Sequence, residues 1–167
     1  PLPDGLWEVL QAKGIDINAQ DAPPRPAKLL LADMDSTMIG QECVDELADM
    51  AGVGPRVAEI TARAMNGELD FEAALTERVG LLKGLPVSVI DQVMAERITY
   101  TAGGATLVAT VKAMGGTTAL VSGGFTAFTS RVGAHLGFDE NRANTLIEQE
   151  GVLTGEVGRP ILGAQAK

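Results

Sequence analysis

The chain has 167 residues, 46% of them hydrophobic, and a formal net charge of −9, a composition typical of a globular protein with one sizeable core. The acidic balance argues against binding to nucleic acid or to an anionic membrane, because both attract basic surfaces. It leaves a small anionic substrate open, since a few local donors suffice to bind one. No apolar run is long enough for a membrane helix, and the single cysteine, Cys43, excludes an internal disulfide. The start also lacks the pattern of a secretory signal, so we expect a cytoplasmic location.

The first 27 residues are expected to form a helix and a linker that precede the main domain. Residues 6–13 have the pattern of a short helix, which Gly14 would end. Three prolines follow between residues 21 and 28, and this density of proline indicates a stiff connection. We therefore assign residues 1–27 to an N-terminal helix and a proline-rich linker.

The main domain is expected to open with a buried strand and then a block of helices. Residues 29–34 are apolar on both faces, as in a parallel sheet that is covered on both sides. From residue 41 to about residue 98 the apolar spacing is helical and gives no strand signal. Four helices are expected there, starting near Gln41, over 55–65, after Asp70 as a predicted N-cap, and over 87–97.

The second half of the chain returns to strands alternating with helices. We expect a helix over 105–114, a buried strand over 117–121, a tight turn at 122–125, a helix that ends near Gly137, and a hairpin over 144–157. Right-handed crossover connections would place the two buried strands side by side and parallel. The predicted fold class is therefore α/β, a Rossmann-like parallel-sheet core with a four-helix cap inserted after the first strand. The core comprises residues 28–40 and 101–167, and the cap comprises residues 41–100.

Polar residues at the ends of the two predicted strands suggest one ligand site. Ligands of such sheets bind beyond the carboxyl ends of strands, which places Asp33, Asp35, Ser122, Gly123 and Gly124 around one crevice. Two adjacent carboxylates repel each other unless a cation or a shared proton relieves them, and Mg²⁺ is the natural partner. The alternative is that the aspartates only cap the following turn. The Ser-Gly-Gly sequence could form an anion-binding nest, and the combination points to phosphoryl transfer.

Longer stretches of the sequence resemble a known family. "LLLADMDST" is similar to the Asp-x-Asp-x-Thr motif that opens the phosphatases of the haloacid dehalogenase superfamily, and "ALVSGGFT" is similar to their second motif. Lys167 aligns with the lysine of the third motif. "DMDSTMIGQECVDELADMAG" and "TARAMNGELDFEAALTERVGLLKG" narrow the resemblance to the phosphoserine phosphatases, and it covers residues 28–167. The resemblance implies Mg²⁺-dependent hydrolysis of phosphoserine, the last step of serine biosynthesis, through an aspartyl-phosphate.

The resemblance also implies the catalytic roles. Asp33 would be the nucleophile and a Mg²⁺ ligand. Asp35 would protonate the leaving serine oxygen and then activate water, while its backbone carbonyl binds the metal. Ser122, the amide of Gly123 and Lys167 would hold the phosphate oxygens.

Substrate contacts are implied in the same way. Glu42 would bind the ammonium group of the substrate and Arg78 its carboxylate, while Met65 and Phe71 would line the cap side of the pocket and Gly124 would complete the phosphate-binding segment. Without the resemblance, Glu42 would be interpreted as a residue of the first helical turn and Arg78 as a solvated arginine. Met65 and Phe71 would be interpreted as ordinary core residues.

The sequence departs from the family in one respect. The family's fourth motif, an acidic loop beyond the third-motif lysine that supplies a further carboxylate to Mg²⁺, is not among the 167 residues. We expect either a fragment with weakened metal binding or a longer protein that supplies the loop. Three activities stay open: a phosphatase, a phosphotransferase to another hydroxyl acceptor, and a catalytically silent phosphoserine-binding module. The expected partner is a small phosphorylated amino acid, and the protein is expected to be a monomer or a homodimer.

Overall fold

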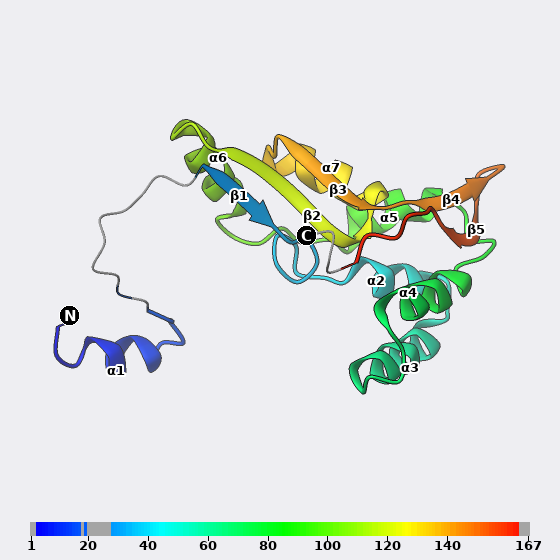
Figure 1. The fold of residues 1–167 in the computed structure, drawn as a ribbon, viewed down its shortest axis with the longest axis horizontal. Helices are drawn as coiled ribbons and strands as arrows, with labels where there is room; N and C mark the ends of the chain where they lie inside the picture. The colour runs from blue at the N-terminus through cyan, green and yellow to red at the C-terminus, as the bar shows by residue number, and fades with distance from the viewer. Residues whose placement is uncertain (1–2, 18, 20–27, 164–167) are drawn as a thin grey trace.

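A three-stranded parallel sheet forms the centre of the molecule. The computed structural model describes residues 3–17, 19 and 28–163 (Figure 1). The strands are β1 (Leu29–Ala32), β2 (Thr117–Phe125) and β3 (Glu140–Asn144), in the order β1-β2-β3. Leu29 pairs with Thr117 and Ala119 pairs with Glu140, and both pairings are parallel. The predicted α/β class and the adjacency of the first two strands are confirmed. The third strand was not expected, because its sequence, ENRAN, is polar and does not alternate.

Two helices pack on this sheet. Helix α6 (Gly104–Ala113) contacts β1 and β2, and α7 (Thr126–Leu136) contacts β2 and β3. The prediction that the first strand is buried on both faces is wrong for the described part of the chain. Leu29 and Leu31 are 59% and 48% exposed, while Ala32 is buried. The side chains of a strand alternate between its faces, and within the described residues only one face of β1 is covered.

The expected block of helices follows β1. Its members are α2 (Cys43–Met50), α3 (Gly54–Met65), α4 (Phe71–Gly80) and α5 (Ser88–Glu96). The predicted N-cap of α4 is present, since the Asp70 carboxylate accepts a hydrogen bond of 2.7 Å from the backbone N–H of Ala73. The N-terminal helix α1 (Leu6–Gln11) contains no buried residue. No helix among the described residues has both the length and the apolar character needed to cross a membrane.

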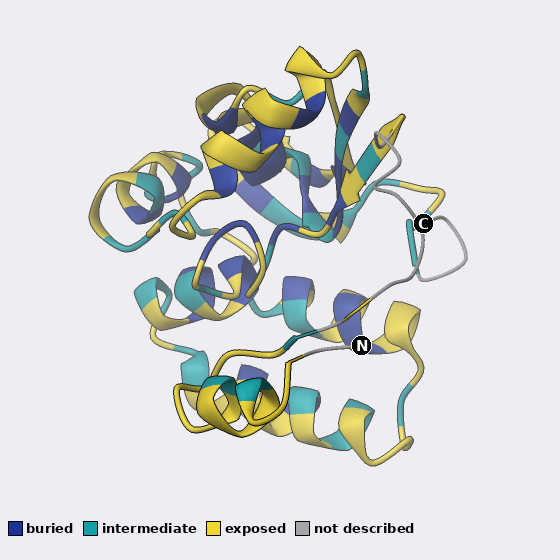
Figure 2. Ribbon diagram, turned by 90° about the vertical axis from the view of Figure 1, so that its left-hand side faces the viewer, coloured by how far each residue is buried: buried dark blue, intermediate teal, exposed yellow. Residues whose placement is uncertain are grey.

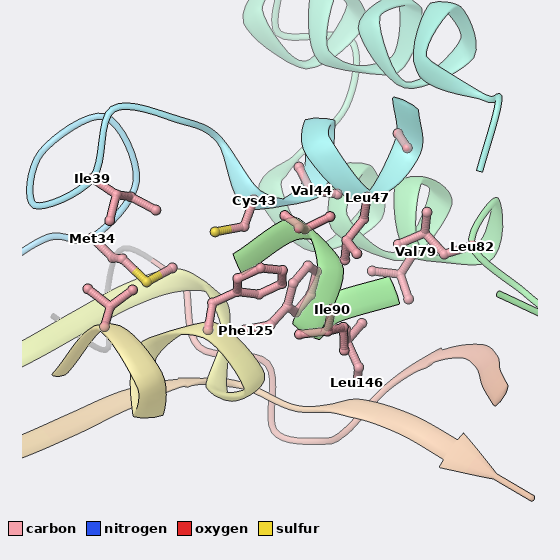
Figure 3. Packing of buried hydrophobic residues seen from close by; sticks show 14 of the residues in the cluster. Met34, Ile39, Cys43, Val44, Leu47, Val79, Leu82, Ile90, Phe125 and Leu146 are labelled. Carbon is pink, nitrogen blue, oxygen red and sulfur yellow. The ribbon is translucent and has the colours of Figure 1, made fainter. Parts of the chain in front are cut away.

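The buried residues of the sheet and of the helical block form one continuous core (Figures 2 and 3). Phe125, at the end of β2, belongs to the same cluster as Val44 and Leu47 of α2 and Val79 of α4. Burial of each large apolar side chain contributes about 2 kcal/mol, so this cluster stabilises the contact between the two parts. The two parts share one hydrophobic interior, and the division of the chain into a core and a cap stays a prediction.

A hairpin attaches to the same region. Strands β4 (Leu146–Gln149) and β5 (Val152–Val157) are antiparallel, as predicted, and both turn residues, Glu150 and Gly151, have positive φ angles of 52° and 79°. A two-residue hairpin turn of this kind requires that backbone conformation. The N–H of Gly84 donates to the carbonyl of Leu153 at 2.8 Å, so the hairpin is fastened to the loop between α4 and α5.

The shared core predicts a large difference between two leucines in helices. Leu47 is fully buried, whereas Leu107 is 46% exposed. We expect Leu47→Ala to lower the free energy of unfolding by about 3 kcal/mol, and Leu107→Ala by about 0.5 kcal/mol or less. Urea denaturation measures both values, and similar losses for the two variants would contradict the packing described.

Candidate active site

The carboxylate pair lies just beyond the carboxyl end of β1. Met34, between the two aspartates, is fully buried and fixes the local backbone. Asp33 is exposed, and its Oδ1 accepts a hydrogen bond of 2.8 Å from the N–H of Met34. Asp35 is partly buried, and both of its oxygens accept hydrogen bonds of 3.1 Å: Oδ1 from the N–H of Cys43 and Oδ2 from the hydroxyl of Ser122. Asp35 is therefore held by groups from α2 and from β2.

Both aspartates line a cavity of about 240 Å³, together with most of the residues predicted for the site. The lining residues are Asp33, Asp35, Glu42, Val44, Phe71, Leu75, Arg78, Ser122, Gly123, Gly124 and Phe125. They come from the loop after β1, from the end of β2 and from the helical block. The residues at the two strand ends thus line one cavity, and residues of the helical block line it with them.

The Ser122–Phe125 segment is not the tight turn that the sequence predicts. Strand β2 continues to Phe125, with a shift of register against β3 after Val121, and helix α7 begins at Thr126. The two glycines instead allow side chains from other elements to approach the backbone closely. A Cβ atom on Gly124 would lie 2.7 Å from Asp35 Oδ2, and one on Gly123 would lie 3.1 Å from the ring of Phe71.

The expected anion-binding nest is also partly different. The N–H of Gly124 donates to the hydroxyl oxygen of Ser122 at 2.9 Å, so this amide is already satisfied within the segment. The Ser122 hydroxyl in turn donates to Asp35. In this structure the hydrogen bonds of the Ser122–Gly124 segment therefore lead to the Asp35 carboxylate, and the Gly124 amide is not left open for an anion.

Glu42 is held by a residue that sequence reasoning missed. The hydroxyl of Ser36 donates to Glu42 Oε1 at 2.6 Å. Ser36 has a φ of 52°, in the left-handed region that non-glycine residues seldom adopt. The only signal in the sequence was the position of Ser36 directly after the aspartate pair. Its conformation places the hydroxyl beside the start of α2, where Glu42 is the N-cap residue.

Helix α4 supplies the opposite wall. Phe71 is its first residue and Arg78 lies two turns further on, and both line the cavity, as their shared helix face predicts. The Arg78 Nε donates to the carbonyl of Ala74 at 3.3 Å. Burial raises the pKa of the neighbouring Asp45 carboxyl, and the positive charge of Arg78 partly offsets this effect. The guanidinium therefore acts electrostatically on Asp45, a carboxyl that does not itself line the cavity.

The thiol of Cys43 is a structural group rather than a reactive one. Its side chain is buried, and burial, reinforced by the negative charge of Asp35, raises the pKa of the thiol far above its usual range. A thiol without accessible thiolate is a poor nucleophile. Cys43 therefore contributes packing and its backbone N–H, not reactivity.

The charge of the lining favours a cation. Asp33, Asp35 and Glu42 are acidic, and Arg78 is the one basic residue among the described residues that line the cavity. Across residues 3–17, 19 and 28–163, no group of three or more His, Cys, Asp or Glu side chains is arranged to hold a metal ion. Mg²⁺ needs no such group, because it is commonly held by one or two carboxylates with water and phosphate. The residues present therefore fit Mg²⁺ better than a metal such as zinc.

Two predicted residues are not brought to the cavity by the described structure. Met65, at the end of α3, is 84% exposed and does not line the cavity. Lys167 lies outside the described residues. Besides Phe71, the apolar lining residues that the helices supply are Leu75 of α4 and Val44 of α2.

Comparison with known proteins now identifies the family. The haloacid dehalogenase-like hydrolase family matches residues 30–167. The chain belongs to the haloacid dehalogenase-like hydrolases. It is 45% identical to a phosphoserine phosphatase of Archaeoglobus fulgidus over 92% of its own length, but covers only 45% of that protein.

Solved structures of phosphoserine phosphatases are similar to this chain in fold and in sequence. A phospho-aspartyl intermediate analogue of phosphoserine phosphatase has a TM-score of 0.72 and 42% identity, with 80% of this chain and 63% of that chain covered. A substrate-bound phosphoserine phosphatase complex has a TM-score of 0.73 and 41% identity, with the same coverage of 80% and 63%. The haloacid dehalogenase-like chain thus spans about half to two thirds of the length of these relatives.

The close approach at Gly124 predicts a sharp effect of one added methyl group. We expect Gly124→Ala to lower the free energy of unfolding by about 1–3 kcal/mol, because the new Cβ would overlap the Asp35 carboxylate. Gly80→Ala is the control, since nothing lies within 4 Å of its Cβ position and its φ is not in the left-handed region. Denaturant unfolding compares the two, and an equal effect of both substitutions would refute the contact.

Proposed function

We propose that the chain provides the catalytic centre of a Mg²⁺-dependent phosphatase that hydrolyses O-phospho-L-serine to L-serine and phosphate through an aspartyl-phosphate. The observation that carries this proposal is the single cavity in which Asp33 and Asp35 meet Ser122 of β2 and Arg78 of the cap. The similarity to phosphoserine phosphatases, one of them named as a phospho-aspartyl analogue, supports it.

The two aspartates differ in a way that suits different roles. Asp33 is the more exposed and is assigned as the nucleophile: its carboxylate oxygen bonds to phosphorus while the bond from phosphorus to the serine oxygen breaks. Asp35, oriented through both oxygens, gives its proton to that leaving oxygen. A water then attacks the phosphorus, Asp35 takes a proton from it, and phosphate leaves with Asp33 restored.

Positive charge is required for this reaction. The described lining carries three acidic residues and one basic residue, which by themselves would repel a phosphate group. Mg²⁺, when bound, would neutralise charge on the transferring group and on the carboxylates. The Asp33 carboxylate and the Asp35 backbone carbonyl are the groups that would hold it.

To recognise an amino acid, the protein must supply an anionic group for the substrate's ammonium and a cationic group for its carboxylate. Glu42 is proposed to bind the ammonium group, and its hydrogen bond from Ser36 restricts its side chain before the substrate arrives. Arg78 is proposed to bind the carboxylate, for which its planar fork of donors is suited. Phe71 lies over Gly123 and would exclude water from the reacting end.

Replacement of the nucleophile tests the reaction. We expect Asp33→Asn to lower phosphate release from phosphoserine in the presence of Mg²⁺ by more than about a thousandfold, with little change in thermal stability. Asp16→Asn, at an exposed aspartate of the N-terminal segment, should leave the rate unchanged. Phosphate release is measured colorimetrically, and a similar rate for Asp33→Asn would overturn the mechanism. Phosphate that appears on an added alcohol instead of in solution would favour the phosphotransferase.

Three substrates separate the roles of Glu42 and Arg78. Phosphoethanolamine lacks the carboxylate of phosphoserine, and 3-phosphooxypropionate lacks its ammonium group. We expect Arg78→Lys to raise KM about tenfold for phosphoserine and 3-phosphooxypropionate but not for phosphoethanolamine. Glu42→Gln should raise KM for phosphoserine and phosphoethanolamine but not for 3-phosphooxypropionate.

The control for these assays is Arg63→Lys, which alters a surface ion pair with Glu77 in the same cap. It should leave KM for all three substrates unchanged. An increase that is uniform across the substrates for either site variant would argue against the assigned contacts.

A further inference from the structure

A buried asparagine that does not line the cavity is bonded to its wall. Asn144, the last residue of β3, is 2% exposed. Its Nδ2 donates to the carbonyl of Gly123 at 2.8 Å and to the carbonyl of Leu162 at 3.2 Å. Its Oδ1 accepts from the N–H of Leu162 at 2.6 Å. Because one partner is a donor and two are acceptors, only this orientation of the amide satisfies all three.

The bond to Gly123 bears directly on the candidate active site. The carbonyl of Gly123 and the N–H of Gly124 belong to one planar peptide group, which turns as a unit. Asn144 holds the carbonyl end, while the N–H end donates to the Ser122 hydroxyl at 2.9 Å. The Ser122 hydroxyl then donates to Asp35 Oδ2. A continuous series of hydrogen bonds thus leads from Asn144 to the Asp35 carboxylate.

Two adjacent glycines make such a restraint necessary. Gly123 and Gly124 are required where they are because Phe71 and Asp35 approach them closely. The same absence of side chains leaves their backbone with many accessible conformations. A peptide held at both ends loses this freedom, so Asn144 compensates for the flexibility that the close contacts impose.

The other bonds of Asn144 reach the segment 158–163, which contacts both Thr145, the residue after β3, and helix α4. The N–H of Gly158 donates to the carbonyl of Thr145 at 2.8 Å, and Arg159 forms an ion pair with Glu72 of α4. A Cβ on Gly163 would lie 3.4 Å from the Phe71 ring. Asn144 is therefore the point at which this segment and the Gly123 peptide meet.

We propose that Asn144 is a positioning residue: it fixes the Gly123–Gly124 peptide, and through Ser122 the carboxyl of Asp35, while it holds the segment 158–163 against the cavity wall. Its effect on turnover rests on the proposed function. The displacement of a proton donor by a fraction of an ångström lowers the rate of the chemical step more than it lowers substrate affinity.

The test uses two variants of Asn144 and one matched control in the full chain. Asn144→Ala removes the amide, and Asn144→Asp keeps its shape and acceptor while removing both donated hydrogen bonds. Thr129→Val removes another buried hydrogen bond, 2.9 Å from Thr129 Oγ1 to Asn141 Oδ1, between α7 and β3 and away from the cavity. The melting temperature, the kinetics with phosphoserine and the exchange rate of the Gly124 amide are measured for each.

We expect both Asn144 variants to lower kcat by about tenfold or more, with KM changed by less than about threefold, and to accelerate exchange of the Gly124 amide. Thr129→Val should lower the melting temperature but leave both kcat and that exchange rate unchanged. A loss of kcat that follows the melting temperature in all three variants would overturn the proposal, as would unchanged exchange at Gly124. If the wild-type chain has no phosphoserine phosphatase activity, the proposed function fails, and the exchange measurement alone decides the role of Asn144.

Discussion

The parallel pairing of β1 with β2 is the constraint on which the site depends. The register that sets Ala32 beside Leu120 brings the residues that follow each strand out at the same edge of the sheet. Asp35 and Ser122, 87 residues apart in the chain, thereby come within 3.1 Å of each other. A slip of the register by one residue would turn each side chain to the other face and separate this pair.

The helical block is joined to this sheet by packing and by the backbone. Phe125 lies in one cluster with residues of α2 and α4, and the hairpin of β4 and β5 is hydrogen-bonded to the loop after α4. The cavity walls are therefore supported from several directions. Their separation from one another would require the exposure of buried apolar surface, which is costly in water.

The sequence was informative where chemistry and periodicity agree. The strand that leads to Asp33 and Asp35, the N-cap at Asp70 and the hairpin at Glu150-Gly151 each have a local cause in the sequence, and each was predicted. The sequence predicts a turn at Gly123 and Gly124, whereas both lie in β2, because the contacts that require glycine come from residues distant in the chain. Strand β3 and Asn144 were missed for a related reason, since a short polar strand has no apolar alternation and an asparagine reveals its partners only in three dimensions. The exposure of Leu29, Leu31 and Met65 likewise depends on which elements cover them.

The long separation between the paired strands also bears on how the chain folds. Closing a loop of this length before any contact forms costs conformational entropy, so direct pairing of β1 with β2 would be slow. The intervening chain contains the helices α2 to α6, whose backbone hydrogen bonds join residues close in sequence. Helices that form early shorten the flexible path between the strands. Compared with a flexible segment of the same length, this helical one lowers the entropic cost of assembling the sheet edge that carries the two carboxylates.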